Sequence, residues 1–211
     1  MKKTCIVFFL IISHVLSSQS EAESLLNNVS VKVESYDNIA ISFKYVLINI
    51  EEDINQETRG EVTMQGDKYV LNIMDITRMF DGSTLYSISP EDEEVTISSE
   101  NSEDDSTITP SKMLSFYKEG YTFEMDIVQT INGRKIQYIK MNPIDSDSEI
   151  NHILLGIDIK TYHIHNLIEI GSNKTKTILT VNSFKTNQEL SKSLFTFDYK
   201  KYNEYYINKI D

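Results

Sequence analysis

Residues 60–88 read GEVTMQGDKYVLNIMDITRMFDGSTLYSI, and this stretch decides the fold class. Apolar and polar side chains alternate through most of it, which is the two-residue period of a β-strand. Gly66-Asp67 turns the chain between two such runs. Asp81-Gly82 is a hairpin signal, because both central positions of that turn favour positive φ. The stretch therefore predicts a series of short strands joined by hairpins, which pair antiparallel.

The same alternation recurs on both sides of this stretch. Apolar residues share one strand face over residues 39–47, and Asn132-Gly133 marks another hairpin turn. A sheet of this size usually curls toward a barrel. We predict about nine to eleven strands, at residues 39–47, 60–64, 68–73, 76–79, 84–88, 95–97, 121–128, 134–141, 152–159, 162–170 and 176–184.

Two segments have helical spacing instead. The first comprises residues 25–36 and follows Ser24, a candidate N-cap. The second comprises residues 109–118, begins with Thr109-Pro110 and is terminated by the following Gly120. The fold class predicted is α+β: an incomplete, half-open antiparallel β-barrel that two short helices close. The second helix carries a large apolar face for its length, formed by Met113, Leu114, Phe116 and Tyr117.

Composition excludes several classes of protein. Hydrophobic residues make up 40% and charged residues 25% of the 211-residue chain, which is ordinary for a soluble globular domain. One cysteine excludes a disulfide framework and a Cys-based zinc site. The net charge of −12 argues against nucleic acid or an anionic membrane surface as a general partner.

The N-terminus has the pattern of an export signal. Lys2 and Lys3 precede an apolar run over residues 5–16, and small or polar residues follow at 17–22. The run is too short for a membrane-spanning helix, so an uncleaved anchor is the weaker alternative. We expect residues 1–20 to be a cleaved signal peptide, with cleavage within 17–22, and residues 21–211 to form one exported domain without cysteine.

Three chemical alternatives stay open. The acidic segment 98–107 is typical of a solvated loop and lacks the spacing and glycine of a calcium-binding loop. His163 and His165 would share a strand face, and without an evident third ligand we expect an exposed pair and not a metal site. Nucleophile-elbow, phosphate-loop and metal-helix motifs are missing, although an unrecognised hydrolase remains conceivable.

Several segments in order resemble a known family over residues 24 to 202. They are Tyr36-Asp37-Asn38-Ile39, residues 41–45, Gly66-Asp67-Lys68-Tyr69, residues 81–86, residues 110–117 and residues 193–198. No single segment is specific, whereas their order and spacing are. In these features the chain resembles the LolA-type lipoprotein carriers of the Gram-negative periplasm, and most closely their Bacteroidota branch.

The resemblance implies a fold and a function. Family members have an incomplete barrel with a helical lid over a hydrophobic cavity, and they are not enzymes and use no metal or cofactor. They accept acylated lipoproteins from an inner-membrane lipoprotein-releasing transporter and deliver them to an outer-membrane acceptor. We expect a periplasmic monomer whose cavity and lid bind lipid through Leu25, Val29, Ile41, Phe43, Tyr45, Leu47, Tyr69, Leu71, Tyr86, Met113, Leu114, Phe116 and Tyr117.

The sequence departs from the better-known branch of the family. That branch has a lid-fastening arginine near the position of Gln65-Gly66 and a tryptophan at the position of Tyr86, and it has a proline after the Phe-Asp motif. The apolar strand residues are equally typical of a packed core. Two alternative functions remain, a carrier of another amphiphile such as a glycolipid or pigment and a lipoprotein-sensing regulator. Such regulators carry a second domain, for which we expect no space after Phe197.

Overall fold

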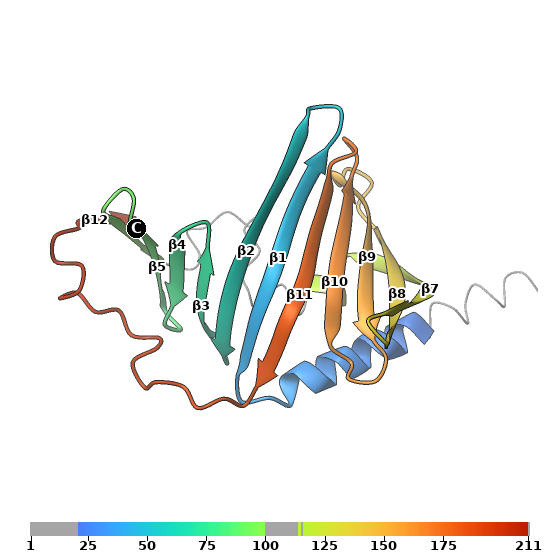
Figure 1. Ribbon diagram of the computed structural model, residues 1–211, viewed down its shortest axis with the longest axis horizontal. Coiled ribbons are helices and arrows are strands. Elements are labelled where there is room, and N and C mark those ends of the chain that lie inside the picture. Colours follow the sequence, from blue (N-terminus) through green and yellow to red (C-terminus); the bar gives the residue numbers. More distant parts are fainter. Residues whose placement is uncertain (1–20, 100–113, 115, 211) are drawn as a thin grey trace, which may run out of the picture. The chain divides into compact units, whose positions relative to one another are not determined.

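The computed structural model describes residues 21–99, 114 and 116–210, as a helix, twelve strands and a short 3-10 turn (Figure 1). The helix comprises residues 21–34, and the 3-10 turn comprises Phe116–Lys118. The strands are β1 (Ile39–Asn49), β2 (Ile54–Gln65), β3 (Lys68–Ile73), β4 (Ile76–Phe80), β5 (Thr84–Ser89), β6 (Glu94–Ser99), β7 (Tyr121–Ile131), β8 (Arg134–Pro143), β9 (Ile150–Asp158), β10 (Ile164–Gly171), β11 (Lys176–Thr186) and β12 (Tyr206–Ile210).

The strands form one mostly antiparallel sheet. Their order is β12-β6-β5-β4-β3-β2-β1-β11-β10-β9-β8-β7, so β12 and β7 are its two edges and the sheet does not close on itself. Neighbours from β2 to β6 and from β7 to β11 pair antiparallel, whereas β12 runs parallel to β6. The predicted open antiparallel architecture is therefore confirmed.

The chain divides into two compact units, and each contains part of the sheet. The first comprises Met1–Glu34, Val46–Gln56 and Tyr117–Thr180, and its described part holds the helix and strands β7 to β10. The second comprises Ser35–Tyr45, Glu57–Phe116 and Val181–Asp211, and it holds β3 to β6, β12 and the segment that leads to β12.

The hairpin turns follow the sequence pattern, with one exception. Asn132 and Gly133 both have positive φ, 50° and 77°, as the prediction requires. At the Asp81-Gly82 turn only Gly82 does, with φ of 100°. The Asp81 carboxylate instead accepts hydrogen bonds from the backbone N–H groups of Ser83 and Thr84, both at 2.9 Å. The prediction of two positive φ angles is wrong here, because this carboxylate caps a three-residue loop.

The N-terminal helix is confirmed, with shifted ends. Ser24 lies inside residues 21–34, so its predicted role as N-cap is wrong. The helix buries Ala22, Leu26 and Val29, which recur at the spacing of one helical face. No helix in the described ranges is both long and apolar enough to cross a membrane.

Three predictions fall wholly or partly outside the described residues. These are the signal peptide at 1–20, most of the acidic loop at 98–107 and most of the second helix at 109–118. Of the predicted second helix, the structure describes Leu114 and the 3-10 turn Phe116–Lys118. Gly120 follows with φ of 85°, the left-handed conformation that glycine adopts most readily.

Strand β12 is an element that the sequence did not predict. Its residues pair in parallel with β6, in a register that places Ile207 beside Val95. Val95 is fully buried, and Ile207 packs against the same hydrophobic cluster. The alternation over these five residues is too short to indicate a strand without its distant partner.

Candidate functional site

One face of the second unit carries a continuous set of buried apolar side chains from five adjacent strands. We call this set the β1–β5 apolar face. Its members are all at most 8% exposed, and they are Ile39, Ile41, Phe43, Val62, Met64, Tyr69, Phe80 and Leu85.

The strand register explains why these residues share one face. Met64 pairs with Tyr69, Tyr69 with Phe80, and Phe80 with Leu85, so they form a row across four strands. Directly paired residues point to the same side of a sheet. The Tyr69 and Phe80 rings lie 5.8 Å apart, within the range of favourable aromatic contact.

Gly60 fixes the position of the Phe43 ring on this face. A Cβ atom at residue 60 would lie 2.5 Å from Phe43 Cζ and 3.0 Å from the Asn72 carbonyl oxygen. The ring therefore lies directly over the glycine backbone. This contact joins β1 to β2 and leaves no space for a larger residue at position 60 without movement of the ring.

The opposite face of β3 to β6 is a closed core and not an open surface. We call it the C-terminal cluster, and it consists of Met79, Tyr86, Ile88, Val95 and Phe197, with Val70, Ile97, Tyr202, Tyr205 and Ile207 packed against it. The Phe197 ring stacks on Tyr86 at 4.4 Å and on Tyr202 at 5.3 Å. The chain segment that follows β11 thus covers this face with aromatic rings.

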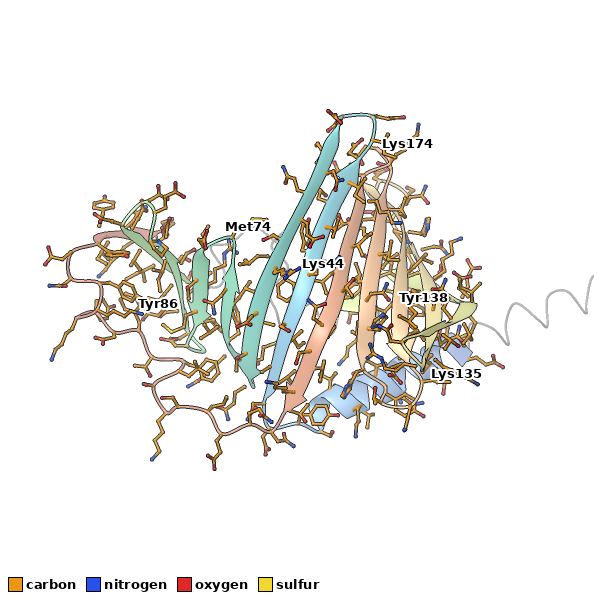
Figure 2. The ribbon with its side chains drawn as sticks, viewed as in Figure 1. Lys44, Met74, Tyr86, Lys135, Tyr138 and Lys174 are labelled. Atoms are coloured by element: carbon orange, nitrogen blue, oxygen red, sulfur yellow. The ribbon has the colours of Figure 1, made fainter. Side chains whose placement is uncertain are left out.

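The predicted lipid-binding residues divide among these surfaces. Ile41, Phe43 and Tyr69 belong to the β1–β5 apolar face. Tyr45 and Leu71 are half-buried and point to the same side by strand alternation. Tyr86 belongs to the C-terminal cluster instead. Figure 2 shows Tyr86 on the small strands of the second unit.

The remaining predicted residues lie mainly in the first unit. Val29 and Tyr117 are buried there, whereas Leu25 and Leu47 are half-buried. Leu26, Val31, Tyr117 and Phe123 contribute to a groove of about 500 Å³ between the helix and β7. Lys118 donates a 2.9 Å hydrogen bond to Glu34 and so ties the 3-10 turn to the helix. Leu114 and Phe116 are half-buried, and Met113 lies outside the described residues.

Sequence reasoning missed five members of the β1–β5 apolar face. The predicted strands include Ile39, Val62, Met64 and Leu85, whereas Phe80 lies one residue beyond the predicted strand 76–79, and none of the five was assigned to the site. The signal that would find them is the register, because Met64, Phe80 and Leu85 lie in one row with Tyr69.

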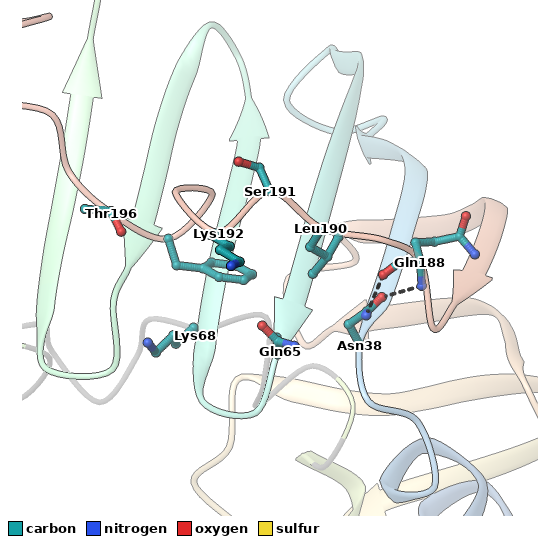
Figure 3. A pocket seen from close by; sticks show the side chains of 9 residues that line it. Asn38, Gln65, Lys68, Gln188, Leu190, Ser191, Lys192 and Thr196 are labelled. Carbon is teal, nitrogen blue, oxygen red and sulfur yellow. Dashed lines mark hydrogen bonds between the residues drawn. The ribbon is translucent and has the colours of Figure 1, made fainter.

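A polar groove of about 510 Å³ lies in the second unit, beside the start of the C-terminal segment (Figure 3). Lys68, Lys192 and Phe195 contribute to its walls. Asn38 lines it as well, and its side chain donates to the Gln188 carbonyl at 3.0 Å and accepts from the Gln188 N–H at 2.9 Å. These paired bonds fix the start of the C-terminal segment beside β1.

The two histidines do not form the exposed pair that the sequence predicts. His163 precedes β10, and β10 has an irregular register between Ile164 and Asn166. His165 is only 8% exposed, with Arg134 Nη2 3.5 Å from its Nδ1. Burial lowers the pKa of both rings, with smaller contributions from Lys32 at His163 and Arg134 at His165. Within the described residues, no three metal-ligating side chains gather at one point.

One carboxyl group of the first unit is half-buried within the sheet. Glu169 lies on β10 between Ile153 of β9 and Thr177 of β11, and burial raises the pKa of its side chain above the ordinary 4.5. Burial raises the pKa of the Tyr121 hydroxyl as well, and the charge of Glu169 adds to this shift. Glu169 therefore destabilises the fold when it is ionised.

We expect Glu169→Gln to stabilise the protein at pH 7. The contribution of Glu169 to folding is most favourable below pH 4.5 and is lost as the pH rises through its raised folded-state pKa. The advantage of the glutamine variant should therefore shrink as the pH falls from 7 toward 4.5. Urea unfolding across this pH range measures it, with the exposed Glu119→Gln as control. An advantage that grows on acidification would contradict the assignment.

The comparisons with known proteins agree with this architecture. Residues 74–198, more than half of the chain, match the family model described as "Outer membrane lipoprotein carrier protein LolA". No curated protein matches the sequence significantly. The match runs from β4 through β11 to the Phe195–Phe197 segment.

Solved structures share the fold at low sequence identity. An uncharacterized conserved protein from Thermus thermophilus has a TM-score of 0.61 at 9% identity, over 90% of this chain and 99% of the other. LprF from Mycobacterium bovis has a TM-score of 0.51 at 12% identity, over 82% and 96%. MucB has a TM-score of 0.52 at 12% identity, over 85% of this chain and 63% of MucB.

At such identities these likenesses establish the fold, and the family model carries the assignment. The open antiparallel sheet and the N-terminal helix agree with the family that the matched segment indicates. The chain belongs to the LolA family of outer membrane lipoprotein carrier proteins.

Proposed function

We propose that this protein is a periplasmic carrier that holds the acyl chains of lipoproteins against its β1–β5 apolar face. It would move them from the inner to the outer membrane. The observation that carries the proposal is that β3 to β5 are apolar on both sides. The C-terminal cluster accounts for one side, and the β1–β5 apolar face is the other.

Acyl chains require such a surface in a water-soluble carrier. Exposure to water costs about 0.8 kcal/mol per CH₂ group, so a carrier must cover several chains with apolar area. Phe43, Tyr69 and Phe80 provide large apolar side chains on this face, and Met64 provides a flexible one. The aromatic rings supply apolar area and methionine adjusts to ligands of varied shape, which suits a carrier of several cargoes.

The proposed partners follow from the family. The cargo is an acylated lipoprotein, the donor is an inner-membrane lipoprotein-releasing transporter, and the acceptor lies in the outer membrane. Residues 1–20 are the signal for export, and the carrier acts as a monomer. Cargo transfer needs no cofactor, because no covalent bond is made or broken.

Native mass spectrometry of the protein purified gently from its own periplasm tests the proposal. We expect a bound mass that matches an acylated lipoprotein. A free glycolipid or pigment as the only bound mass would replace the proposal with an amphiphile carrier. An empty protein that stays empty after incubation with detergent-solubilised lipoprotein would contradict carriage and favour the alternative of a lipoprotein-sensing regulator.

A further inference from the structure

Strand β2 extends well beyond its neighbour β3. The ladder between them begins at Gly60, opposite Ile73, and ends at Gln65, opposite Lys68. The chain leaves β3 through Met74 and Asp75, whose positive φ angles of 51° and 60° turn it into β4. Figure 1 shows β2 continuing past this turn. In the part of the chain that the structure describes, no strand pairs with the outer edge of Glu57–Arg59.

A groove of about 620 Å³ lies at the corner between this edge and the β3–β4 turn. Met74 is 59% exposed there, and Figure 2 shows it at the tip of the turn. The lining is largely polar and comprises Ser42, Phe43, Thr58, Arg59, Gly60, Glu61, Asn72, Ile73, Met74, Asp75, Ile76, Thr77 and Asn182. A polar groove at a strand edge suits a peptide better than an acyl chain.

The groove is continuous with the β1–β5 apolar face. Phe43 lines the groove and belongs to the apolar face, and Gly60 lies directly beneath its ring. A molecule with acyl chains on the apolar face would therefore place whatever is attached to them in this groove. In a lipoprotein, the attached group is the peptide that follows the lipidated cysteine.

The side chains at this edge point to the two faces of the sheet and not along its outer edge. Glu57 forms ion pairs with Lys44 at 3.4 Å and with Arg59 at 3.8 Å. Glu57 and Arg59 point to one face of β2 by strand alternation, and Thr58 points to the other. Strand alternation therefore does not place their side chains over the outer edge, where an added strand would form its backbone hydrogen bonds.

We propose that Glu57–Arg59 bind the peptide after the lipidated cysteine of the cargo as an added β-strand. The inference rests on the proposed function and names a second contact of the same cargo. Backbone hydrogen bonds are independent of sequence, and the backbone is what all cargo peptides share. A carrier of many lipoproteins can therefore hold each of them at this edge.

The shortness of the edge makes the contact depend on the lipid. Three residues form few hydrogen bonds, so a free peptide should not bind measurably. Acyl chains held on the apolar face raise the effective concentration of the attached peptide at the edge. The shortness of the edge and the charges of Glu57 and Arg59 also disfavour its pairing with a second copy of this chain.

Amide hydrogen exchange of the full chain tests this inference residue by residue. The probes are a synthetic triacylated cysteine followed by an eight-residue Ser/Asn/Ala peptide, the same peptide without lipid, and palmitate. With the lipopeptide, the outward-facing amides within Glu57–Arg59 should exchange about tenfold more slowly or better. Palmitate and the unlipidated peptide should leave these amides unchanged.

A cysteine scan supplies a second measurement. With the single Cys5 replaced by Ser, Thr58→Cys should form disulfides with cysteines placed at alternate positions of the probe peptide, as paired strands require. The exposed Lys209→Cys is the matched control. Lipopeptide binding without protection or alternating cross-links would overturn the added strand and leave acyl carriage intact. If neither the lipopeptide nor palmitate binds, the proposed function fails as well.

Discussion

Phe197→Ala is expected to lower the free energy of unfolding by about 4 kcal/mol, because a buried phenylalanine is lost from the C-terminal cluster. The ring is 8% exposed, stacks on Tyr86 and Tyr202, and meets Tyr199 edge-on at 4.7 Å. Removing it leaves a cavity that the rigid neighbouring rings cannot fill. Urea unfolding monitored by circular dichroism measures the change.

Tyr206→Ala is the matched control for this prediction. Tyr206 lies in the same C-terminal region, but its side chain is 68% exposed. We expect its loss to change stability by less than about 1 kcal/mol, as is usual for surface positions. Equal effects of the two variants would mean that Phe197 is not a core residue. Tyr86 would then again be a candidate for the lipid site.

Tyr45→Asp is expected to weaken lipopeptide binding about 100-fold or more. Tyr45 is half-buried on β1 and points to the side of Ile41 and Phe43. A carboxylate there would lie against acyl chains without a compensating partner, which costs about 3 kcal/mol or more. Because the position is only half-buried, the variant should still fold. Titration with a fluorescent triacylated lipopeptide measures the loss.

Lys44→Asp places the same carboxylate on the opposite side of the same strand. It also removes the ion pair with Glu57, in which the side chains are 37% and 48% exposed. Such a pair contributes at most about 1 kcal/mol, so the control should fold and bind acyl chains normally. If Tyr45→Asp binds as tightly as Lys44→Asp, the acyl chains do not lie on the β1–β5 apolar face.

Local sequence patterns account for most of the strands. β3 spans Lys68–Ile73 as predicted, because Gly66-Asp67 precedes it and its apolar residues alternate. The Asn132-Gly133 turn also follows the prediction, since these two residue types adopt positive φ at low cost. The prediction that His163 and His165 form an exposed pair is wrong, because the exposure of a strand residue depends on which distant segments pack over it.

The candidate site was only partly predictable. Alternation along one strand identifies residues such as Ile41 and Phe43 that share a face. Alternation does not show whether Tyr69 or Tyr86, which lie on other strands, points to the same side of the sheet as these residues. Both are aromatic residues in apolar strands. The register separates them, because Tyr69 pairs with Met64 and Phe80, whereas Tyr86 pairs with Met79 and Ile97.

The sequence by itself determined the strands other than β12, most of their turns, the N-terminal helix and the family resemblance, because these depend on neighbouring residues and on motif order. Only the tertiary structure decided that the C-terminal segment covers one face of β3 to β6 and that β12 joins the sheet in parallel. It also decided that β2 keeps an open edge beyond Gly60. These features arise from contacts between residues far apart in the chain, and local periodicity carries no information about which distant segments meet.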